Sequence, residues 1–525
     1  MSNFIKRSPL FILSLFFILL LSMYLQSWMD ANRDAVWLLH CTQLFLQGGQ
    51  YYKDFFETNP PLALFFHVPP EIIATWFGWN DYFTLAGYVY GLSILSIALS
   101  YFLLKKSHFS DMFTKSFLCV FAVVVSIVPF FWFLDRETYA IILTFPYVLL
   151  ILCRLLQAKI PPSLSVLIGF LAAIGFGIKP YFLLPLFFIE LYLMIMQRTI
   201  FSWWRVESVT LFLCLFFYLL SVVVFLKVYL TDVMPLAALL YLPAFEKASW
   251  GELLSFALAY HVQYGLIVLA WAFFNWREKK ERTFFSLLAL SCAGFLIAYF
   301  IQSRKWYYHI YPSVAMLLLI LSGVVILFFL DLMKLKTVSM KLISQGVCAF
   351  LAMALISGTF STALCMNMVY FSAKTEQKAP NAMLIHYLNQ YAQHQNVFIV
   401  SNWFLQESVR YNTSAIVTSR FPSMLLVPGI QLLHNQNRVV EAQQAKTKFM
   451  QLIMEDVKRH PPVWIVIEQE GFQSMYAGRG LRYKFLPFFL SDPVFYAFFQ
   501  HYKLVAVLPD YRIYHYCQAG VGVVR

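Results

Sequence analysis

The stretch 307–330 reads YYHIYPSVAMLLLILSGVVILFFL and contains no Asp, Glu, Lys or Arg. A helix needs roughly 20 apolar residues to cross the hydrocarbon core of a membrane, so this stretch is long enough to span one. Similar apolar runs occur along most of the chain, and together they predict about eleven crossings. The other runs lie near 10–25, 82–104, 114–134, 138–153, 161–178, 181–197, 208–230, 252–275, 283–302 and 342–370.

The composition of the whole chain agrees with these runs. Of the 525 residues, 60% are hydrophobic and only 12% are charged, whereas soluble proteins average roughly 45–50% apolar and about 25% charged residues. The chain therefore cannot cover itself with a water-compatible surface. This excludes a soluble enzyme, a secreted disulfide scaffold, a disordered chain and a free nucleic-acid binder, and it predicts a polytopic α-helical membrane protein.

The eight cysteines are scattered, and no two form a C-x-x-C pair. Neither a zinc site nor a dense disulfide framework is indicated. We interpret them as small core hydrophobes, with a Cys41–Cys517 bridge as the alternative if both residues face an oxidising compartment.

The distribution of Lys and Arg predicts the orientation in the membrane. Lys6 and Arg7 precede the first apolar run, and no small-residue cleavage site follows it, so we expect an uncleaved anchor with a cytoplasmic N-terminus. Alternating the crossings from there gives fewer basic residues in the outer loops than in the inner ones, as the positive-inside rule requires for a multi-pass protein of the cytoplasmic (inner) membrane. The basic residues of the outer loops are Arg33, Lys53, Arg136, Lys179, Lys247, Arg304 and Lys305.

The composition changes near Ser372, where polar residues return. Short β-branched or aromatic runs then alternate with helical stretches at Asn381–His394 and Val439–Arg459, a pattern typical of a small α/β domain. The runs are Asn396–Val400, Ala415–Thr418, Val463–Glu468, Lys503–Leu508 and Arg512–Tyr516. We therefore predict a transmembrane domain over 1–371, with a first outer loop at 28–81, and a soluble α/β domain over 372–525 on the periplasmic (extracytoplasmic) side.

Ionisable residues at membrane depth cost roughly 2.5–3.5 kcal/mol each at a helix centre, so those that the positive-inside rule does not explain indicate function. In the predicted topology all of them fall on the outer side. They are Asp30, Asp34, Lys53, Asp54 and Glu57 of the first outer loop, then Asp135, Arg136 and Glu137, then Lys179, and finally Arg304, Lys305 and His309.

The first outer loop carries a family resemblance. Asp34 follows the first crossing, and the loop later reads Glu57-Thr58-Asn59-Pro60-Pro61-Leu62. This arrangement resembles the first outer loop of GT-C glycosyltransferases, in the protein O-mannosyltransferase and aminoarabinose transferase branch, where an acidic motif precedes D-x-H-P-P-L or K-P-P-L. Here Glu replaces Asp and Asn replaces His, and Ala35 follows Asp34, so the adjacent acidic pair of the mannosyltransferases is absent and sugar identity is not carried over.

The resemblance implies a GT-C-like fold that moves a sugar from a polyprenyl-phosphate carrier to an acceptor on the outer face of the membrane. The acceptor is a lipid, a glycan or a protein, and membrane lipids surround the helices. Such a transfer needs a base for the acceptor hydroxyl and cations for the leaving phosphate. The candidates are Asp34 and Glu57 as catalytic residues, Arg136, Lys179, Arg304 and Lys305 as phosphate ligands, and Asp54, Asn59, Glu137 and His309 as supporting residues.

Structural interpretations stand beside these roles. Asp34 can cap the helix that follows it, Glu57 can pair with Lys53 one helical turn earlier, and Pro60-Pro61 can end a helix. No nucleotide site is needed, and a divalent metal, although compatible with the loop carboxylates, is not indicated because cations are interleaved with them.

Two other functions fit a polytopic protein of this composition. The first is a transporter or lipid flippase for envelope glycoconjugates, in which paired interrupted helices and midplane polar groups are expected. The second is a purely structural membrane scaffold.

Overall fold

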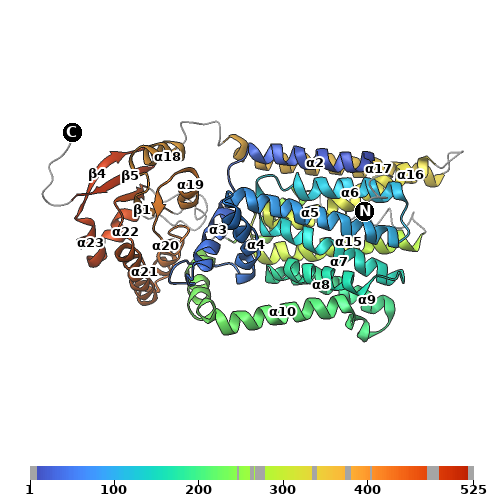
Figure 1. Ribbon diagram of the computed structural model, residues 1–525, viewed down its shortest axis with the longest axis horizontal. Coiled ribbons are helices and arrows are strands. Elements are labelled where there is room, and N and C mark those ends of the chain that lie inside the picture. The colour runs from blue at the N-terminus through green and yellow to red at the C-terminus, as the bar shows by residue number, and fades with distance from the viewer. Residues whose placement is uncertain are drawn as a thin grey trace. The chain divides into compact units, whose positions relative to one another are not determined.

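Figure 1 shows a computed structural model of the chain, which describes residues 9–244, 247–260, 265, 278–333, 340–372, 380–401, 405–469 and 484–517. The chain divides into two compact units. The helical unit comprises Met1–Asn32, Pro60–Leu220 and Ala248–Ser372, and the sheet unit comprises Arg33–Asn59, Ser221–Lys247 and Ala373–Arg525. The sheet unit thus includes part of the first predicted outer loop.

The helical unit is built from apolar helices of different lengths. They are α2 (Pro9–Ser27), α4 (Pro61–Phe77), α5 (Asp81–Lys106), α6 (Asp111–Ser126), α7 (Arg136–Leu155), α8 (Pro162–Gly177), α9 (Leu183–Gln197), α10 (Val206–Phe225), α13 (Trp250–Ala259), α15 (Lys279–Gln302), α16 (Tyr307–Leu332) and α17 (Met340–Ser372). Short 3-10 turns occur at Phe130–Trp132, Pro180–Phe182 and Ile200–Trp203. Asn80 and Ser110 begin α5 and α6 with side chains that accept a hydrogen bond from the backbone of the first turn.

Within the described residues, eight helices are long and apolar enough to cross a membrane. They are Pro9–Ser27, Asp81–Lys106, Arg136–Leu155, Pro180–Gln197, Val206–Phe225, Lys279–Gln302, Tyr307–Leu332 and Gln345–Met368, and each overlaps a predicted run. The runs 114–134 and 161–178 form helices of only 16 residues, and most of 252–275 lies outside the described residues. The chain therefore has the helices of a multi-pass membrane protein, and the count of about eleven stays a prediction.

Burial separates the centre of the helical unit from its periphery. Helices α7 and α16 are buried along most of their length, whereas few residues of α2 and α10 are buried. Helix α2 nevertheless packs on α6, where the buried hydroxyl of Ser22 donates to the carbonyl of Ser126 at 2.6 Å. Charged residues at the ends of α7 consequently lie inside the protein.

The sheet unit contains a five-stranded mixed sheet with the order β2-β1-β3-β5-β4. The strands β1 (Asn396–Val400), β2 (Ile416–Val417) and β3 (Trp464–Glu468) are parallel, and β5 (Tyr511–Tyr516) and β4 (Tyr502–Val507) continue it antiparallel. All five strand runs predicted from sequence are confirmed within two residues. Burial of β1 and β3 on both faces explains their unbroken apolar sequences.

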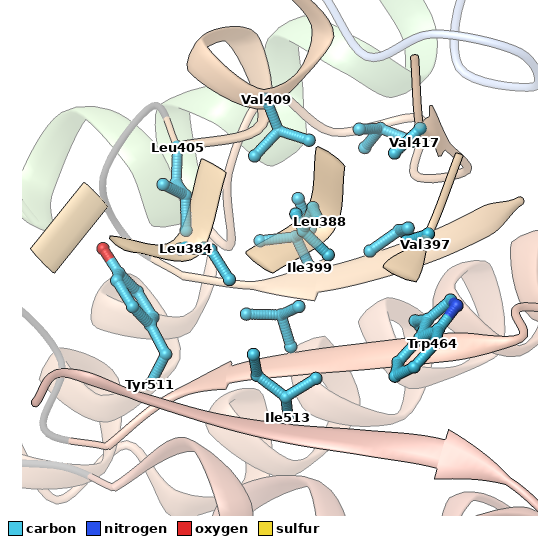
Figure 2. Close-up of a cluster of buried hydrophobic side chains, with 13 residues drawn as sticks. Leu384, Leu388, Val397, Ile399, Leu405, Val409, Val417, Trp464, Tyr511 and Ile513 are labelled. Atoms are coloured by element: carbon cyan, nitrogen blue, oxygen red, sulfur yellow. The ribbon is translucent and has the colours of Figure 1, made fainter. Parts of the chain in front are cut away.

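Helices cover both faces of this sheet, with α18 (Pro380–Tyr391) and α19 (Leu405–Asn412) on one side and α20 (Val427–Asn435) and α21 (Val439–Arg459) on the other (Figure 1). The bounds of α21 confirm the prediction from sequence. Two short helices, α22 (Phe485–Leu490) and α23 (Pro493–Phe499), precede β4. Figure 2 shows the core between the sheet and α18 and α19, where Leu388 and Val409 pack against Ile399.

The first outer loop contributes to the sheet unit through α3 (Arg33–Leu46), which packs on α19. The same loop is also held by α21, because Arg459 Nη1 donates to the backbone carbonyl of Lys53 at 3.1 Å and to Asp54 Oδ1 at 2.8 Å. A segment of α- and π-helical turns, Tyr229–Ala244, completes the unit. All eight cysteines are free, so the alternative of a Cys41–Cys517 bridge is wrong.

Candidate functional site

Four charged residues meet at the N-terminal end of α7, and we call them the α7 cluster: Asp135, Arg136, Glu137 and Lys179. Asp135 is the N-cap of α7, and its Oδ1 accepts from Arg136 N at 2.9 Å and from Arg136 Nε at 3.3 Å. Glu137, in the first turn, forms an ion pair with Lys179 from the junction of α8 and α9. All four side chains are at most one-tenth exposed, so the cluster is a buried group of two opposite pairs.

The first turn of α16 borders the α7 cluster. Lys179 Nζ lies 5.4 Å from the centre of the Tyr308 ring, and His309 is within electrostatic range of Lys179, Arg136 and Arg304. The guanidinium of Arg304 lies 5.9 Å from the Trp306 ring, which contacts the His309 ring at 5.1 Å. The structure thus brings together four of the predicted site residues: Arg136, Glu137, Lys179 and His309.

Lys305 has a different environment from its neighbour. Its ammonium is paired with Glu252 of α13 at 2.6 Å, and both side chains are about half exposed. The contact is a surface ion pair, so it gives Lys305 a partner other than a phosphate.

Several buried polar atoms around the α7 cluster have no hydrogen-bond partner in the described part of the chain. They are Asp135 Oδ2, Glu137 Oε2, His309 Nδ1 and His67 Nε2. The Nδ1 of His67 lies 2.7 Å from the carbonyl oxygen of Ala63, an acceptor, so its Nε2 is left as an acceptor. Sequence reasoning missed His67, although an ionisable residue within PLALFFHVPP is a signal of the same kind as those it used.

A second ionic network lies at the other end of α7. Arg154 Nη2 donates to Glu207 Oε2 at 2.9 Å, and Arg205 Nη2 donates to both carboxylate oxygens of Glu190 at 2.7 Å. Tyr147 OH also donates to Glu190 Oε1 at 2.7 Å. Glu190 of α9 is therefore held by Arg205, which lies 15 positions later in the sequence.

The carboxylates of the first outer loop belong to the sheet unit. Glu57 is 2% exposed, and its Oε1 accepts from Asn59 N at 2.5 Å and from Asn59 Nδ2 at 2.6 Å. The residues around Glu57 are not helical, so the interpretation of a helical surface pair with Lys53 is wrong. Pro61 begins α4, so the prolines start a helix instead of ending one, as their missing N–H allows at this position.

Asp34 lies in the first turn of α3, where a carboxylate interacts favourably with the helix dipole. The Asp34 carboxylate is within electrostatic range of Glu407 of α19 and raises the pKa of Glu407. Asp54 is used structurally, because its Oδ2 accepts from Gln50 N at 2.8 Å while Oδ1 binds Arg459.

Glu407 is a buried residue that the sequence did not single out. It is 1% exposed, and neither carboxylate oxygen has a hydrogen-bond partner among the described residues. Burial raises the pKa of Glu407 to about 8, while Arg410 and Arg33 act in the opposite direction. Burial also lowers the pKa of Arg410 to about 10 and the pKa of His40 well below its usual range. In sequence, Glu407 and Arg410 have the i, i+3 spacing of an ordinary surface pair.

The predicted site residues are therefore divided between the two units. Arg136, Glu137, Lys179, Arg304, Lys305 and His309 belong to the helical unit, and Asp34, Asp54, Glu57 and Asn59 belong to the sheet unit. In the described residues, no group of three or more His, Cys, Asp or Glu side chains is placed to hold a metal ion. No protein-family model matches the chain, and no curated protein matches it.

Proposed function

We propose that the chain is an integral-membrane glycosyltransferase of the GT-C type, which moves a sugar from a polyprenyl-phosphate carrier to an acceptor at the outer face of the cytoplasmic membrane. The observation that carries the proposal is the α7 cluster. Burying a cation among apolar helices has a high free-energy cost, so such residues usually mark a functional site. The first-loop motif around Asp34 and Glu57 supports the same reaction.

The α7 cluster suits a phosphate leaving group. An ammonium has three N–H donors, and the bond of Lys179 to Glu137 uses one of them. The remaining donors and the guanidinium of Arg136 can form charge-assisted hydrogen bonds to phosphate oxygens. Because Asp135 and Glu137 fix the two cations in advance, little reorganisation is needed as negative charge develops on the leaving phosphate.

In this proposal the base is Asp34 of the first outer loop. Asp34 accepts the proton of the acceptor hydroxyl as that oxygen attacks the anomeric carbon and the bond to the carrier phosphate breaks. Glu57 is already bonded to Asn59, so we assign it the task of holding the loop. One base and a direct displacement predict inversion at the anomeric carbon.

The test measures transfer from synthetic polyprenyl-phosphate sugars in membranes that contain wild-type protein, Asp34→Asn or Lys179→Met. We expect the Asp34→Asn variant to lose transfer by at least 100-fold, since general base catalysis contributes about 10²–10⁴-fold. Lys105→Met is the control and keeps the wild-type rate, because Lys105 forms an exposed pair with Asp111 and belongs to no candidate site. Equal transfer by wild type and Asp34→Asn removes Asp34 from catalysis.

A transporter or flippase is the second candidate, favoured by the presence of buried ionic networks at both ends of α7. Such residues also line ion and substrate pathways. Movement of a labelled polyprenyl-phosphate sugar across reconstituted vesicles, without transfer to any acceptor, would support it over the enzyme.

A further inference from the structure

The strand order of the sheet unit creates a position where ligands commonly bind. The chain leaves β1, returns on one side as β2, and then crosses to the other side as β3. In open α/β sheets, ligands bind outside the carboxyl ends of the strands where the order reverses in this way. Here that position lies beyond Val400 of β1 and Glu468 of β3.

Polar side chains gather at this end of the sheet. Ser401 Oγ donates to Glu468 Oε2 at 2.8 Å, and both side chains are buried. Tyr511 pairs with Glu468 in register, and its hydroxyl donates to Asn381 Oδ1 at 2.5 Å. Figure 2 shows Leu405 and Tyr511 at this end, with Val397 and Trp464 at the opposite one. Helix α19 therefore begins at the carboxyl edge of the sheet.

Buried polar atoms without partners occur on α19, which begins at this edge, and on α3, which packs on α19. In the described residues, these atoms are Gln406 Oε1, both carboxylate oxygens of Glu407, Arg410 Nε and Trp37 Nε1. Trp37 lies one helical turn before Cys41, whose thiol is within electrostatic range of Glu407 and Arg410. Asp34, one turn before Trp37, also acts on Glu407. We call Asp34, Trp37, Gln406, Glu407 and Arg410 the α3–α19 cluster.

The orphaned atoms require an explanation, since nearly all buried polar groups in native proteins are hydrogen-bonded. A leucine would fill the position of Glu407 without the desolvation cost of a buried carboxyl group. The unpartnered set contains acceptors (Gln406 Oε1) and donors (Arg410 Nε and Trp37 Nε1). A hydroxyl group both donates and accepts, so a ligand with several hydroxyl groups satisfies both kinds of atom.

We propose that the α3–α19 cluster, at the carboxyl edge of β1 and β3, is a saccharide-binding site. The buried Glu407 and Gln406 hold hydroxyl groups of the sugar, and Asp34 lies on the side of α3 that faces Glu407. This assignment rests on the proposed function, in which the saccharide bound here is the acceptor of the transferred sugar.

The experiment uses the full chain in lipid nanodiscs, free of glycoside detergents. Saturation-transfer NMR is recorded with methyl glycosides of glucose, mannose, galactose and N-acetylglucosamine, and with a Ser/Thr-containing peptide as the competing acceptor. We expect at least one glycoside to receive saturation from wild-type protein and the signal to fall at least tenfold in Glu407→Leu and Gln406→Leu. Glu407→Gln, which still donates and accepts, retains at least half of it.

Glu441→Leu is the matched control, because Glu441 belongs to the same unit but is half exposed and paired with Arg438. Its glycoside signal stays at the wild-type value. Unchanged saturation in Glu407→Leu, no saturation of any glycoside by wild type, or saturation of the peptide alone overturns the inference. Lys179→Met separates the two proposals: if the enzyme assignment fails, glycoside binding still depends on Glu407, and if the saccharide site fails, transfer still depends on Lys179.

Discussion

The α7 cluster of the helical unit and Glu407 of the sheet unit are both buried, but their charges are compensated differently. In the helical unit each member of the α7 cluster lies next to an opposite charge, with Asp135 beside Arg136 and Glu137 beside Lys179. In the sheet unit Glu407 is as deeply buried, yet its carboxylate makes no hydrogen bond to any described residue. A paired buried charge is costly to break, whereas a lone buried carboxyl group is costly to keep. Substitutions in the two places are therefore expected to change stability with opposite signs.

The largest effect is expected from Lys179→Met. Removing the ammonium leaves Glu137 buried without its cation, and breaking such a pair from one side destabilises proteins by about 3–5 kcal/mol. Thermal unfolding in detergent, followed by tryptophan fluorescence, measures the change. The double variant Lys179→Met/Glu137→Gln recovers part of the loss, because no uncompensated charge remains. A single variant as stable as wild type would show that the pair is not buried as the structure has it.

Glu407→Leu is expected to act in the other direction. The substitution removes a buried polar group that has no partner among the described residues and fills its space with an apolar side chain. Burying a polar group without a hydrogen bond costs about 1–3 kcal/mol of folding free energy in protein substitution data. The variant is therefore expected to unfold at a higher temperature than wild type. Glu441→Leu, at a half-exposed position of the same unit, leaves the unfolding temperature nearly unchanged. A destabilised Glu407→Leu protein would mean that the carboxyl group serves the fold.

The pH dependence of unfolding provides a second test of the buried Glu407. Glu407 has a folded pKa of about 8, above its unfolded value of about 4.3, so the folded state binds the extra proton between those values. Stability from this group is complete below the unfolded pKa and decreases as pH rises toward 8, by at most about 1.4 kcal/mol per pH unit. Protonation of His40 opposes folding below its unfolded pKa of about 6.5, so the window from 6.5 to 8 isolates Glu407.

Over that window we expect wild type to lose stability relative to Glu407→Leu as pH rises. The groups that act on Glu407 are Arg410 and Arg33, which lower its pKa, and Asp34, which raises it. Unfolding temperatures of both proteins at several pH values measure the difference. Parallel curves for the two proteins would show that Glu407 is ionised in the fold at neutral pH.

The sequence predicts the strands and helices of the sheet unit better than it predicts the partners of buried charges. Local patterns determine the former, whereas tertiary packing determines the latter. The strands β1 and β3 were readable from the β-branched runs NVFIV and WIVIE, and α21 from its helical stretch. Lys179 was singled out, but its partner Glu137 lies 42 positions earlier, and only tertiary packing brings them together. Glu407 went unnoticed for the converse reason, since its spacing from Arg410 is typical of a solvated helix face. Burial of a charged residue leaves no periodic signal when its helix is short.

Lys305→Met gives the smallest expected change and calibrates the comparison. Lys305 and Glu252 approach to 2.6 Å, as close as many buried pairs, yet their side chains are 46% and 50% exposed. Water solvates either charge when its partner is lost, so exposed pairs contribute only about 0.2–1 kcal/mol. The unfolding temperature of Lys305→Met should therefore stay near that of wild type and far above that of Lys179→Met. Similar decreases in unfolding temperature for the two lysine variants would show that distance alone determines the energy of these pairs. A much larger decrease for Lys179→Met would show that burial determines it.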